Sequence, residues 1–410
     1  MSNQKIKHAG IVPLIGGLML GSMEAYGTQP EYLLSYSPFG ANDEHIVKYL
    51  REKRGWKGDY TVLDAEGYEN FVPEQTVDVV SAVCPCAGLS SLSTSSGSDN
   101  PKNEWMLTTC EYVLGKIKPK VFWGENAPRL ATKIGAKVRE SMMALAEEHG
   151  YTFMIYQTKS LLHGVPQIRD RTFYFFFKEE HKVPVFPFVN LERPTIEELL
   201  RSVEGREDDE LVRKDIPSED LFYRFLLEET MGGMTHVEYA EHIDATTTAI
   251  GNFETLTGKT LGDLAEWSQE NGFPEKVYTS LMAKHKKLMS GGGIMRKGTT
   301  VPKDYIGAFV GHMPTSITHP DEDRYLTVRE CLAIMKMPDD FELINPKRQL
   351  NHICQNVPVS TAASVAGMVK QYLAGECEVL DADYAMIDNR NQRVHSVGLF
   401  EKSSLDSFIQ

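Results

Sequence analysis

The first 180 residues of the chain alternate between short apolar runs and stretches with helical periodicity. Residues 10–17 predict a strand that runs into a glycine turn, and residues 18–26 predict the helix after it. A second strand at 31–36 and a second helix at 44–53 repeat this order, and Asp59 lies in a loop beside a third short strand. Strands that alternate with helices form a parallel sheet, and ligands of such sheets bind at the carboxyl ends of the strands.

The same alternation continues as far as residue 177. Further strands are predicted at 77–82, 121–126, 151–158 and 167–177, with helices at 107–117 and 134–149. We therefore predict an α/β fold, with a Rossmann-like sheet flanked by helices and a smaller, irregular second domain.

The alternation stops near residue 184. An acidic stretch at 204–220 and polar helical segments follow, and apolar helices return at 324–335 and 362–373. These changes predict four parts of the chain: a first domain at 1–183, a second at 184–318, a return to the first at 319–375, and a C-terminal tail of unassigned role at 376–410.

Composition limits the partners that the chain can have. The longest apolar run, residues 11–21, is shorter than the ~20 residues of a membrane span and contains glycines and a proline. The first eight residues do not form a secretory signal, and six scattered cysteines favour a reducing compartment. We therefore expect a cytoplasmic protein without a membrane partner.

The formal net charge of −14 is unfavourable for a nucleic-acid partner, so any surface that binds phosphates must be a local basic patch. The best candidate is a glycine-rich segment at 284–297. Its basic residues are Lys284, Lys286, Lys287, Arg296 and Lys297.

Cys86 lies just beyond the strand predicted at 77–82, next to Pro85 and before a Ser- and Asn-rich loop at 91–103. A cysteine at a strand end beneath a mobile loop has the position of a nucleophile. The competing interpretation is a buried thiol, which is the more frequent role of a single cysteine. A zinc site would need further paired cysteines or histidines, which the sequence does not contain.

Two other strands carry charged residues in informative positions. The strand at 121–126 ends on Glu125, and Gln167, Arg169 and Arg171 occupy alternate positions of the strand at 167–177. Side chains alternate between the two faces of a strand, so all three are expected on one face. A solvated sheet edge would give the same pattern.

Taken together and in this order, these segments resemble the DNA cytosine-5 methyltransferase family. Pro85-Cys86 resembles the family's nucleophile motif, with Ala87 where glutamine is usual, and Glu125-Asn126 resembles its Glu-Asn pair. Residues 164–171 match the Gln-x-Arg-x-Arg element, and residues 319–341 resemble the segment that returns to the core. The resemblance covers most of residues 9–180 and 319–373.

The resemblance implies a mechanism and a substrate. In the family the cysteine, here Cys86, attacks C6 of cytosine, while Glu125 holds the N3 edge and Arg171 contacts O2. Arg169 would steady Cys86 or Glu125, and Gln167 belongs to the same catalytic element. The implied substrate is double-stranded DNA, bound by a monomer, and the target base must leave the duplex to react. Ser90 and the basic residues at 284–297 would bind DNA. Residues 91–103 would close over the base, and residues 184–318 would read the major groove.

The resemblance also implies S-adenosylmethionine as the cofactor, although the cofactor motifs differ from the family pattern. Val12 replaces an aromatic residue, Leu14 replaces a glycine, and Ser35 stands where a carboxylate usually holds the ribose. A lost charge-assisted hydrogen bond would weaken binding ~10- to 100-fold. The residues expected to form the cofactor site are Val12, Leu14, Gly16, Gly17, Ser35, Asp59, Pro85 and Asn356.

Three interpretations therefore stay open at the level of sequence. The chain methylates cytosine through a rearranged cofactor pocket, or it transfers another alkyl group from a modified donor, or it is a catalytically silent DNA-binding homologue. An RNA substrate is a further alternative, because some proteins of this fold modify tRNA.

Overall fold

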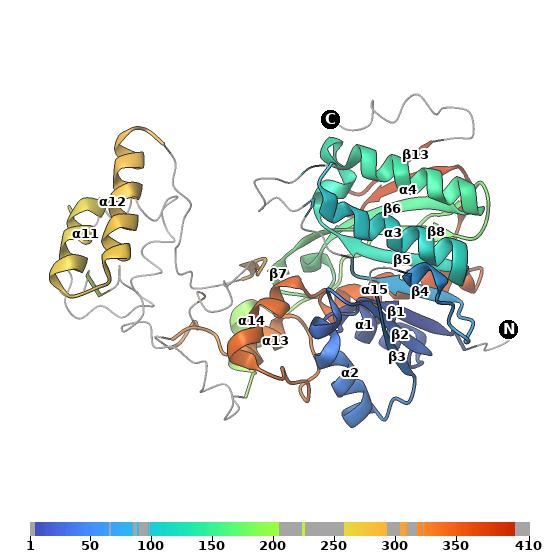
Figure 1. The fold of residues 1–410 in the computed structure, drawn as a ribbon, viewed down its shortest axis with the longest axis horizontal. Coiled ribbons are helices and arrows are strands. Elements are labelled where there is room, and N and C mark those ends of the chain that lie inside the picture. Colours follow the sequence, from blue (N-terminus) through green and yellow to red (C-terminus); the bar gives the residue numbers. More distant parts are fainter. Residues whose placement is uncertain are drawn as a thin grey trace. The chain divides into compact units, whose positions relative to one another are not determined.

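A computed structural model describes residues 5–64, 67–84, 88–89, 97, 99–204, 224–225, 258–292, 304–309, 317, 319–322 and 324–397 of the chain (Figure 1). The chain divides into two compact units. The first consists of Met1–Pro194, Leu332–Asn345 and Gln355–Gln410, and the second of Thr195–Cys331 and Pro346–Cys354.

The first unit is built around a nine-stranded sheet with the strand order β13-β12-β6-β8-β5-β4-β1-β2-β3. Strands β8 and β13 are antiparallel to their neighbours, and the other pairs of neighbours are parallel. The strands are β1 His8–Ile11, β2 Tyr32–Tyr36, β3 Asp59–Leu63, β4 Val79–Ala82, β5 Val121–Asn126, β6 Thr152–Lys159, β8 Asp170–Phe177, β12 Tyr384–Asp388 and β13 Arg393–Val397. This sheet confirms the prediction of a Rossmann-like α/β fold.

Helices and short segments connect these strands. The longer helices are α1 Gly17–Tyr26, α2 Gly40–Arg54, α3 Glu104–Tyr112, α4 Ala136–His149 and α15 Val359–Leu373, and a π-helix, η3 Val113–Ile117, continues α3. The short 3₁₀ turns are η1 Tyr68–Asn70, η2 Pro101–Asn103, η4 Pro128–Ala131, η5 Lys133–Gly135 and η6 Ser160–Leu162. Outside the large sheet lie β7 Gln167–Ile168 and the antiparallel pair β9 Lys182–Pro184 and β11 Val379–Asp381.

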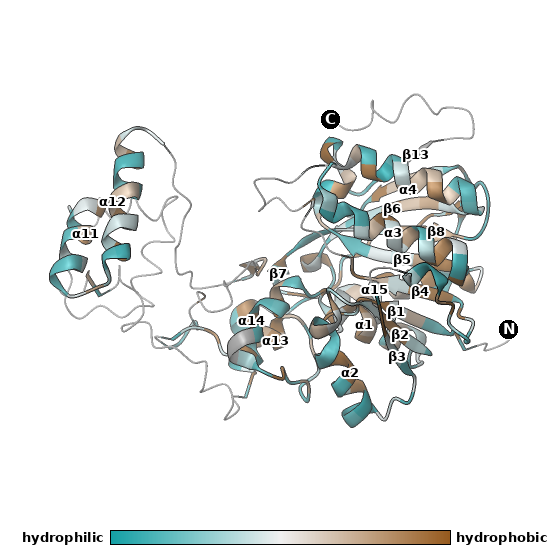
Figure 2. Ribbon diagram, in the orientation of Figure 1, coloured by the Kyte–Doolittle hydropathy of each residue, from teal (hydrophilic) through white to brown (hydrophobic). Residues whose placement is uncertain are grey.

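Helices α1 and α15 pack closely against each other (Figure 1). A Cβ atom at Gly21 would lie 2.5 Å from the Cβ of Ala362, so the close approach of the two helices requires glycine there. Helix α4 ends at Gly150, which has a positive φ of 72°, as its sequence predicts. This helix carries both hydrophilic and hydrophobic residues, as expected for an amphipathic helix that covers a sheet (Figure 2).

The centre of the core is β8, which lies between β5 and β6. Phe173 to Phe177 are all fully buried, because this strand is covered on both faces. Phe122 stacks on Phe176 and Trp123 stacks on Phe175, with 9° between the ring planes in each pair. These stacked rings hold β5 and β8 in register up to the carboxyl end of β5, where Glu125 and Asn126 lie.

The C-terminal segment contributes to this sheet. Strand β12 pairs with β6 in parallel, and β13 pairs with β12. Arg390, just after β12, donates hydrogen bonds to Gln157 (2.9 Å) and Asp170 (3.2 Å). Residues 376–397 therefore extend the first unit, whereas the sequence analysis gave them no structural role.

The second unit contains α5 Ile196–Arg201, α11 Leu261–Glu270, α12 Glu275–Met289 and β10 Ile306–Gly307. Helix α13 Val328–Ile334 begins in the second unit and ends in the first, and α14 Pro346–Gln355 lies in the second unit except for its last residue. Capping boxes at Thr195 and Thr260 begin α5 and α11.

A buried ion pair organises the segment before α13. The Arg324 guanidinium donates two hydrogen bonds of 2.9 Å to the Glu330 carboxylate, which also accepts the main-chain N–H of Thr327 at 2.7 Å. This bidentate pair joins residues 324–331 within the second unit. The chain thus returns to the first unit at Leu332, later than the predicted return at 319. None of the helices in the described residues has the length and hydrophobicity that a membrane span requires.

Candidate active site

The carboxyl ends of β1, β4 and β5 lie side by side in the centre of the sheet. Ile11 is in register with Ala82, and Ala82 with Gly124. After β4 the chain continues through Val83 and Cys84, which are both buried. Cys86, Pro85 and Ser90 lie outside the described residues, as does most of the loop predicted to close over the base.

Glu125 and Arg171 form a buried ion pair at this edge. The Arg171 Nε contacts the Glu125 Oε1, and their side chains are 16% and 3% exposed. Glu125, the penultimate residue of β5, pairs with Phe173 of β8, which lies two residues beyond Arg171. The antiparallel register therefore brings the Glu125 and Arg171 side chains together. A buried carboxylate is stable only when its charge is paired. The structure therefore joins two of the residues that the sequence analysis assigned to catalysis.

Asn126 turns the chain away from the sheet at the same point. Its Oδ1 accepts the main-chain N–H of Ala127 at 2.8 Å, and its Nδ2 lies 3.2 Å from the sulfur of Met106 on α3. Asn126 is fully enclosed, so it fixes the direction in which the chain leaves Glu125.

Gln167 and Arg169 are buried, but they do not lie on one continuous strand with Arg171. The ladder is interrupted at Arg169, between β7 and β8, and the Arg169 carbonyl accepts the main-chain N–H of Ser160 at 3.1 Å. The predicted uninterrupted strand at 167–177 is therefore wrong at this residue. Both polar atoms of the Gln167 amide are buried without a hydrogen-bond partner in the described part of the chain. Such a group needs a partner from the substrate or from another segment.

Cys84 is chemically different from a nucleophile. It is fully buried beneath Tyr174, whose hydroxyl lies 3.8 Å from the Cys84 sulfur. Burial raises the pKa of the Cys84 thiol to about 11, so it stays protonated at neutral pH. Cys84 is therefore a buried thiol, and the choice between a nucleophile and a buried thiol at Cys86 stays a prediction.

The glycine turn after β1 has an unusual backbone. Val12 and Leu14 have φ values of 49° and 53°, and Gly16 has a φ of 100°. A positive φ is uncommon for any residue except glycine and is an outlier for a β-branched valine. Leu14 thus adopts the left-handed conformation that glycine accepts without strain, at the position where the family has glycine. Strain of this kind costs roughly 1–3 kcal/mol per residue and must be balanced by surrounding contacts.

Three contacts hold this turn. The Gly17 N–H donates to the Asn356 Oδ1 at 2.8 Å, and the Leu14 N–H donates to the Asp43 Oδ1 at 2.8 Å. The Gly16 N–H donates to the Pro13 carbonyl at 2.9 Å. A Cβ atom at Gly17 would lie 1.8 Å from the Val357 carbonyl oxygen, so only glycine fits there. Gly17 and Asn356, both predicted cofactor-site residues, are thus brought together from opposite ends of the chain.

Asp43 is a residue of this region that the sequence analysis missed. It lies in the first turn of α2, fully buried, and it accepts hydrogen bonds from Leu14 and, at 3.5 Å, from the Tyr60 hydroxyl. Burial raises the pKa of Asp43 to about 7, although the nearby Ser35 hydroxyl and the Leu14 N–H oppose this shift. The Ser35 hydroxyl is close enough to act on that carboxyl, but it makes no hydrogen bond of regular geometry in the described residues.

The structure shows where two of the predicted cofactor residues, Asp59 and Ser35, lie in the sheet. Asp59 is the first residue of β3, where it pairs with the first residue of β2 at the amino edge of the sheet. This position at the amino edge is unfavourable for contact with a ligand at the carboxyl edge, and the assignment of Asp59 to adenine stays a prediction. Asp64, exposed directly after the end of β3, occupies the carboxyl edge instead. Ser35 is fully buried within β2, one residue before its end.

The basic residues predicted to bind DNA lie in the second unit. Lys284, Lys286 and Lys287 belong to the last turns of α12, and they have no ion pair with any described residue. Arg296 and Lys297 lie outside the described residues.

Comparison with known proteins gives a consistent result. The model of the C-5 cytosine-specific DNA methylase family matches residues 15–371. The type II methyltransferase M.Eco47II of Escherichia coli is 23% identical over 340 residues, which are 81% of this chain and 72% of that protein. The type II methyltransferase M.Sau96I of Staphylococcus aureus is 24% identical over 373 residues, 87% of this chain and 74% of that protein.

Two solved structures are similar in fold. One is a chain encoded within an E. coli prophage, and the other is the methyltransferase EhMeth of Entamoeba histolytica. Both have a TM-score of 0.53 and cover 90% of this chain and 99% of their own, at 16% and 12% identity. At such low identity this likeness supports the fold alone.

Proposed function

Because this chain belongs to the C-5 cytosine-specific DNA methylase family, we propose that it transfers a methyl group from S-adenosylmethionine to C5 of cytosine in double-stranded DNA. The observation that carries the proposal is the buried Glu125–Arg171 ion pair at the carboxyl end of β5, beside the strand that leads to Cys86. A protein that only binds DNA has no need of a carboxylate and a guanidinium buried together at this edge.

Cytosine C5 is too weak a nucleophile to take a methyl group directly. In the proposed reaction the Cys86 thiolate adds to C6, and the electrons of the C5–C6 double bond become available at C5. When bound, S-adenosylmethionine supplies an electrophilic methyl group to C5. A base then removes the C5 proton, the double bond forms again, and the Cys86 thiolate leaves C6.

Glu125 and Arg171 have complementary roles in this proposal. As the base enters, Glu125 takes up a proton from solvent and shares it with cytosine N3, which draws electrons from C6 and favours attack by Cys86. Arg171 contacts O2, and its positive charge also favours the thiolate form of Cys86. Before the base enters, Arg171 stabilises the buried Glu125 carboxylate, so the two side chains are held in place in advance.

The residues at the carboxyl edge are compatible with an adenosine cofactor. The turn at residues 12–17 keeps a glycine-like backbone despite Val12 and Leu14, and Asp64 offers a carboxylate for the adenine amino group. Val12, Gly16 and Asp64 would contact the cofactor, while Asp43 and Asn356 hold the turn through Leu14 and Gly17.

The second unit is proposed to recognise the target. C6 of cytosine is inaccessible within a duplex, so the base must rotate out of the helix at a cost of a few kcal/mol. Lys284, Lys286 and Lys287 supply phosphate contacts, which compensate locally for the acidic chain.

The decisive experiment is mass spectrometry of nucleosides from DNA treated with protein and S-adenosylmethionine. Cys86→Ser is expected to abolish 5-methylcytosine and to leave DNA binding intact, because serine is a much weaker nucleophile. Cys84→Ala, which changes only the buried thiol, is the matched control and should retain product. The wild type, but not Cys86→Ser, should also form a covalent adduct with DNA that contains 5-fluorocytosine. Methylation by Cys86→Ser would overturn the proposal.

A modified donor is the second candidate, and the buried Ser35 in place of a ribose carboxylate favours it. The same measurement separates the two candidates, because a modified nucleoside heavier than 5-methylcytosine in cellular DNA would identify another transferred group. Competition between duplex DNA and tRNA tests the nucleic-acid class.

A further inference from the structure

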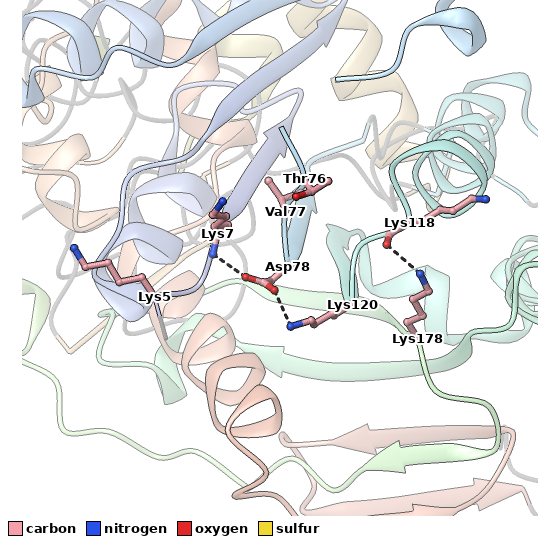
Figure 3. A pocket seen from close by; sticks show the side chains of 8 residues that line it. All are labelled: Lys5, Lys7, Thr76, Val77, Asp78, Lys118, Lys120 and Lys178. Atoms are coloured by element: carbon pink, nitrogen blue, oxygen red, sulfur yellow. Dashed lines mark hydrogen bonds and ion pairs between the residues drawn. The ribbon is translucent and has the colours of Figure 1, made fainter. Parts of the chain in front are cut away.

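A pocket lined by lysines lies at the edge of the sheet opposite the candidate active site (Figure 3). It has a volume of about 480 Å³. We call it the lysine pocket. Its lining residues are Lys5, Lys7, Thr76, Val77, Asp78, Lys118, Lys120 and Lys178.

The topology of the sheet explains why these lysines meet. Lys7 directly precedes β1, Asp78 directly precedes β4, and Lys120 directly precedes β5, so all three lie at the amino ends of parallel strands. Strand β8 is antiparallel to β5, and Phe177 pairs with Val121. Lys178, which follows β8, therefore emerges at the same edge.

The lysine pocket is strongly basic on an acidic chain. Five lysines and one aspartate give a local charge of 5 − 1 = +4, whereas the whole chain carries −14. Asp78 pairs with the Lys120 ammonium at 2.9 Å and also accepts the main-chain N–H of Lys7 at 3.0 Å (Figure 3). The Lys178 ammonium lies 3.5 Å from the Lys118 carbonyl. In the described residues, the ammonium groups of Lys5, Lys7, Lys118 and Lys178 have no carboxylate partner.

A lysine on a protein surface is usually no more than a solvated charge. Here, five lysines from separate segments line one concavity, and a single carboxylate offsets their mutual repulsion. Each ammonium group is a point charge on a flexible stem, which suits the oxygens of phosphate better than one planar carboxylate.

We propose that the lysine pocket binds the phosphate groups of an oligoanion, either a free oligophosphate or the backbone of a nucleic acid. This ligand is distinct from the DNA segment at the active site. The two edges are separated by the length of β5, whose six residues span roughly 20 Å at ~3.3 Å per residue. The inference does not depend on the proposed methylation.

Isothermal titration calorimetry with inorganic tripolyphosphate tests the site directly. The triple variant Lys5→Gln, Lys7→Gln, Lys178→Gln should weaken binding on the order of 100-fold at low ionic strength, because each lost charge accounts for about fivefold. The Lys5, Lys7 and Lys178 side chains are exposed and make no ion pair with the described residues, so the triple variant should keep its fold. The matched control is Lys48→Gln, Lys53→Gln, Lys57→Gln, which removes the same total charge from exposed positions in and after α2 and should bind like the wild type.

Asp78→Asn provides a test of opposite sign. It removes the only carboxylate of the lysine pocket and releases Lys120, so tripolyphosphate should bind about fivefold more tightly. Displacement of tripolyphosphate by a twelve-residue thymidine oligonucleotide would identify nucleic acid as the source of the phosphates, and no displacement would indicate a free oligophosphate. Absence of tripolyphosphate binding to the wild type, or equal weakening in the two triple variants, would overturn the inference.

Discussion

The two halves of the sheet in the first unit differ in how far they follow the pattern of the family. At β5 and β8, Glu125 and Arg171 have the family's residue types and form a buried ion pair. At β1 and β2, Val12, Leu14 and Ser35 depart from the pattern, and the turn is held by Asp43 and Asn356. In terms of the proposed roles, this chain keeps the family's residue types at the groups that would act on the base and departs from them at the groups that would hold a donor.

There is a physical reason for this difference. A reacting base needs charges at defined atoms, and a buried charge cannot move without losing its partner. A cofactor is held by many contacts, so a lost carboxylate can be balanced by others. If this interpretation is right, changes in the β5–β8 half should reduce turnover, and changes in the β1–β2 half should reduce cofactor affinity.

The largest effect is expected for Glu125→Gln. Loss of the ionisable carboxyl should reduce the rate of methyl transfer about 10²- to 10⁴-fold, because glutamine has no acidic proton to share with cytosine N3. Binding of S-adenosylmethionine, measured by calorimetry, should be unchanged. The exposed Glu140→Gln serves as the control and should transfer methyl groups like the wild type. If Glu125→Gln lowered cofactor affinity as much as it lowered the rate, the β5–β8 half and the β1–β2 half of the sheet would not have separate roles.

The next effect concerns Asp43 and the pH dependence of stability. Burial raises the pKa of Asp43 from 3.8 to about 7. Between these two pH values, the folded protein keeps a proton on Asp43 that the unfolded chain has already released. This residue should therefore reduce the free energy of unfolding as pH rises from about 4 to 7, by roughly 4 kcal/mol in total, with no further change above pH 7.

Asp43→Asn removes this titration but keeps a side-chain oxygen to accept the Leu14 N–H. Denaturant unfolding at several pH values should show that the variant gains stability relative to the wild type across this interval. The exposed Asp64→Asn serves as a control and should follow the wild type. A constant difference at all pH values would show that Asp43 does not titrate in this range.

Asn356→Ala should have a smaller effect. It leaves the buried Gly17 N–H without an acceptor, which costs about 1–3 kcal/mol of stability. Because the turn at residues 12–17 loses one of its holding contacts, S-adenosylmethionine should bind more weakly, while the rate at saturating cofactor should change little. The exposed Asn70→Ala should alter neither quantity. A large fall in the rate of Asn356→Ala at saturating S-adenosylmethionine would contradict the assignment of this contact to cofactor binding by the β1–β2 half of the sheet.

Much of the fold could be predicted from sequence because its signals are local. The apolar runs of β1, β2, β4 and β5 and the end of α4 at Gly150 each depend on a few adjacent residues. Glu125 could be singled out because it lies next to the end of a strand and because its neighbours match a known pattern.

Other features depend on contacts between distant segments. Asp43 acts through Leu14, 29 residues away, and the register of β1 and α2 that joins them is invisible in the sequence. The lysine pocket likewise gathers residues from position 5 to position 178. The interruption at Arg169 escaped prediction because the alternation of residues 167–171 fits an unbroken strand equally well. Ser35 stands where a carboxylate usually holds the ribose, but the sequence does not show that a carboxylate at this position would be fully buried beside Asp43.

The smallest predicted effect separates two aspartates at opposite ends of β3. Asp64 follows the carboxyl end of β3, Asp59 is its first residue, and both are exposed. A hydrogen bond to the adenine amino group from a charged carboxylate contributes about 1.5 kcal/mol, so Asp64→Asn should weaken S-adenosylmethionine binding roughly tenfold. Asp59→Asn should leave the affinity as it is, because its edge of the sheet faces away from the turn at residues 12–17. If only Asp59→Asn weakened S-adenosylmethionine binding, the cofactor would lie at the amino end of β3. That result would contradict the proposed cofactor site at the carboxyl ends of β1, β2 and β3.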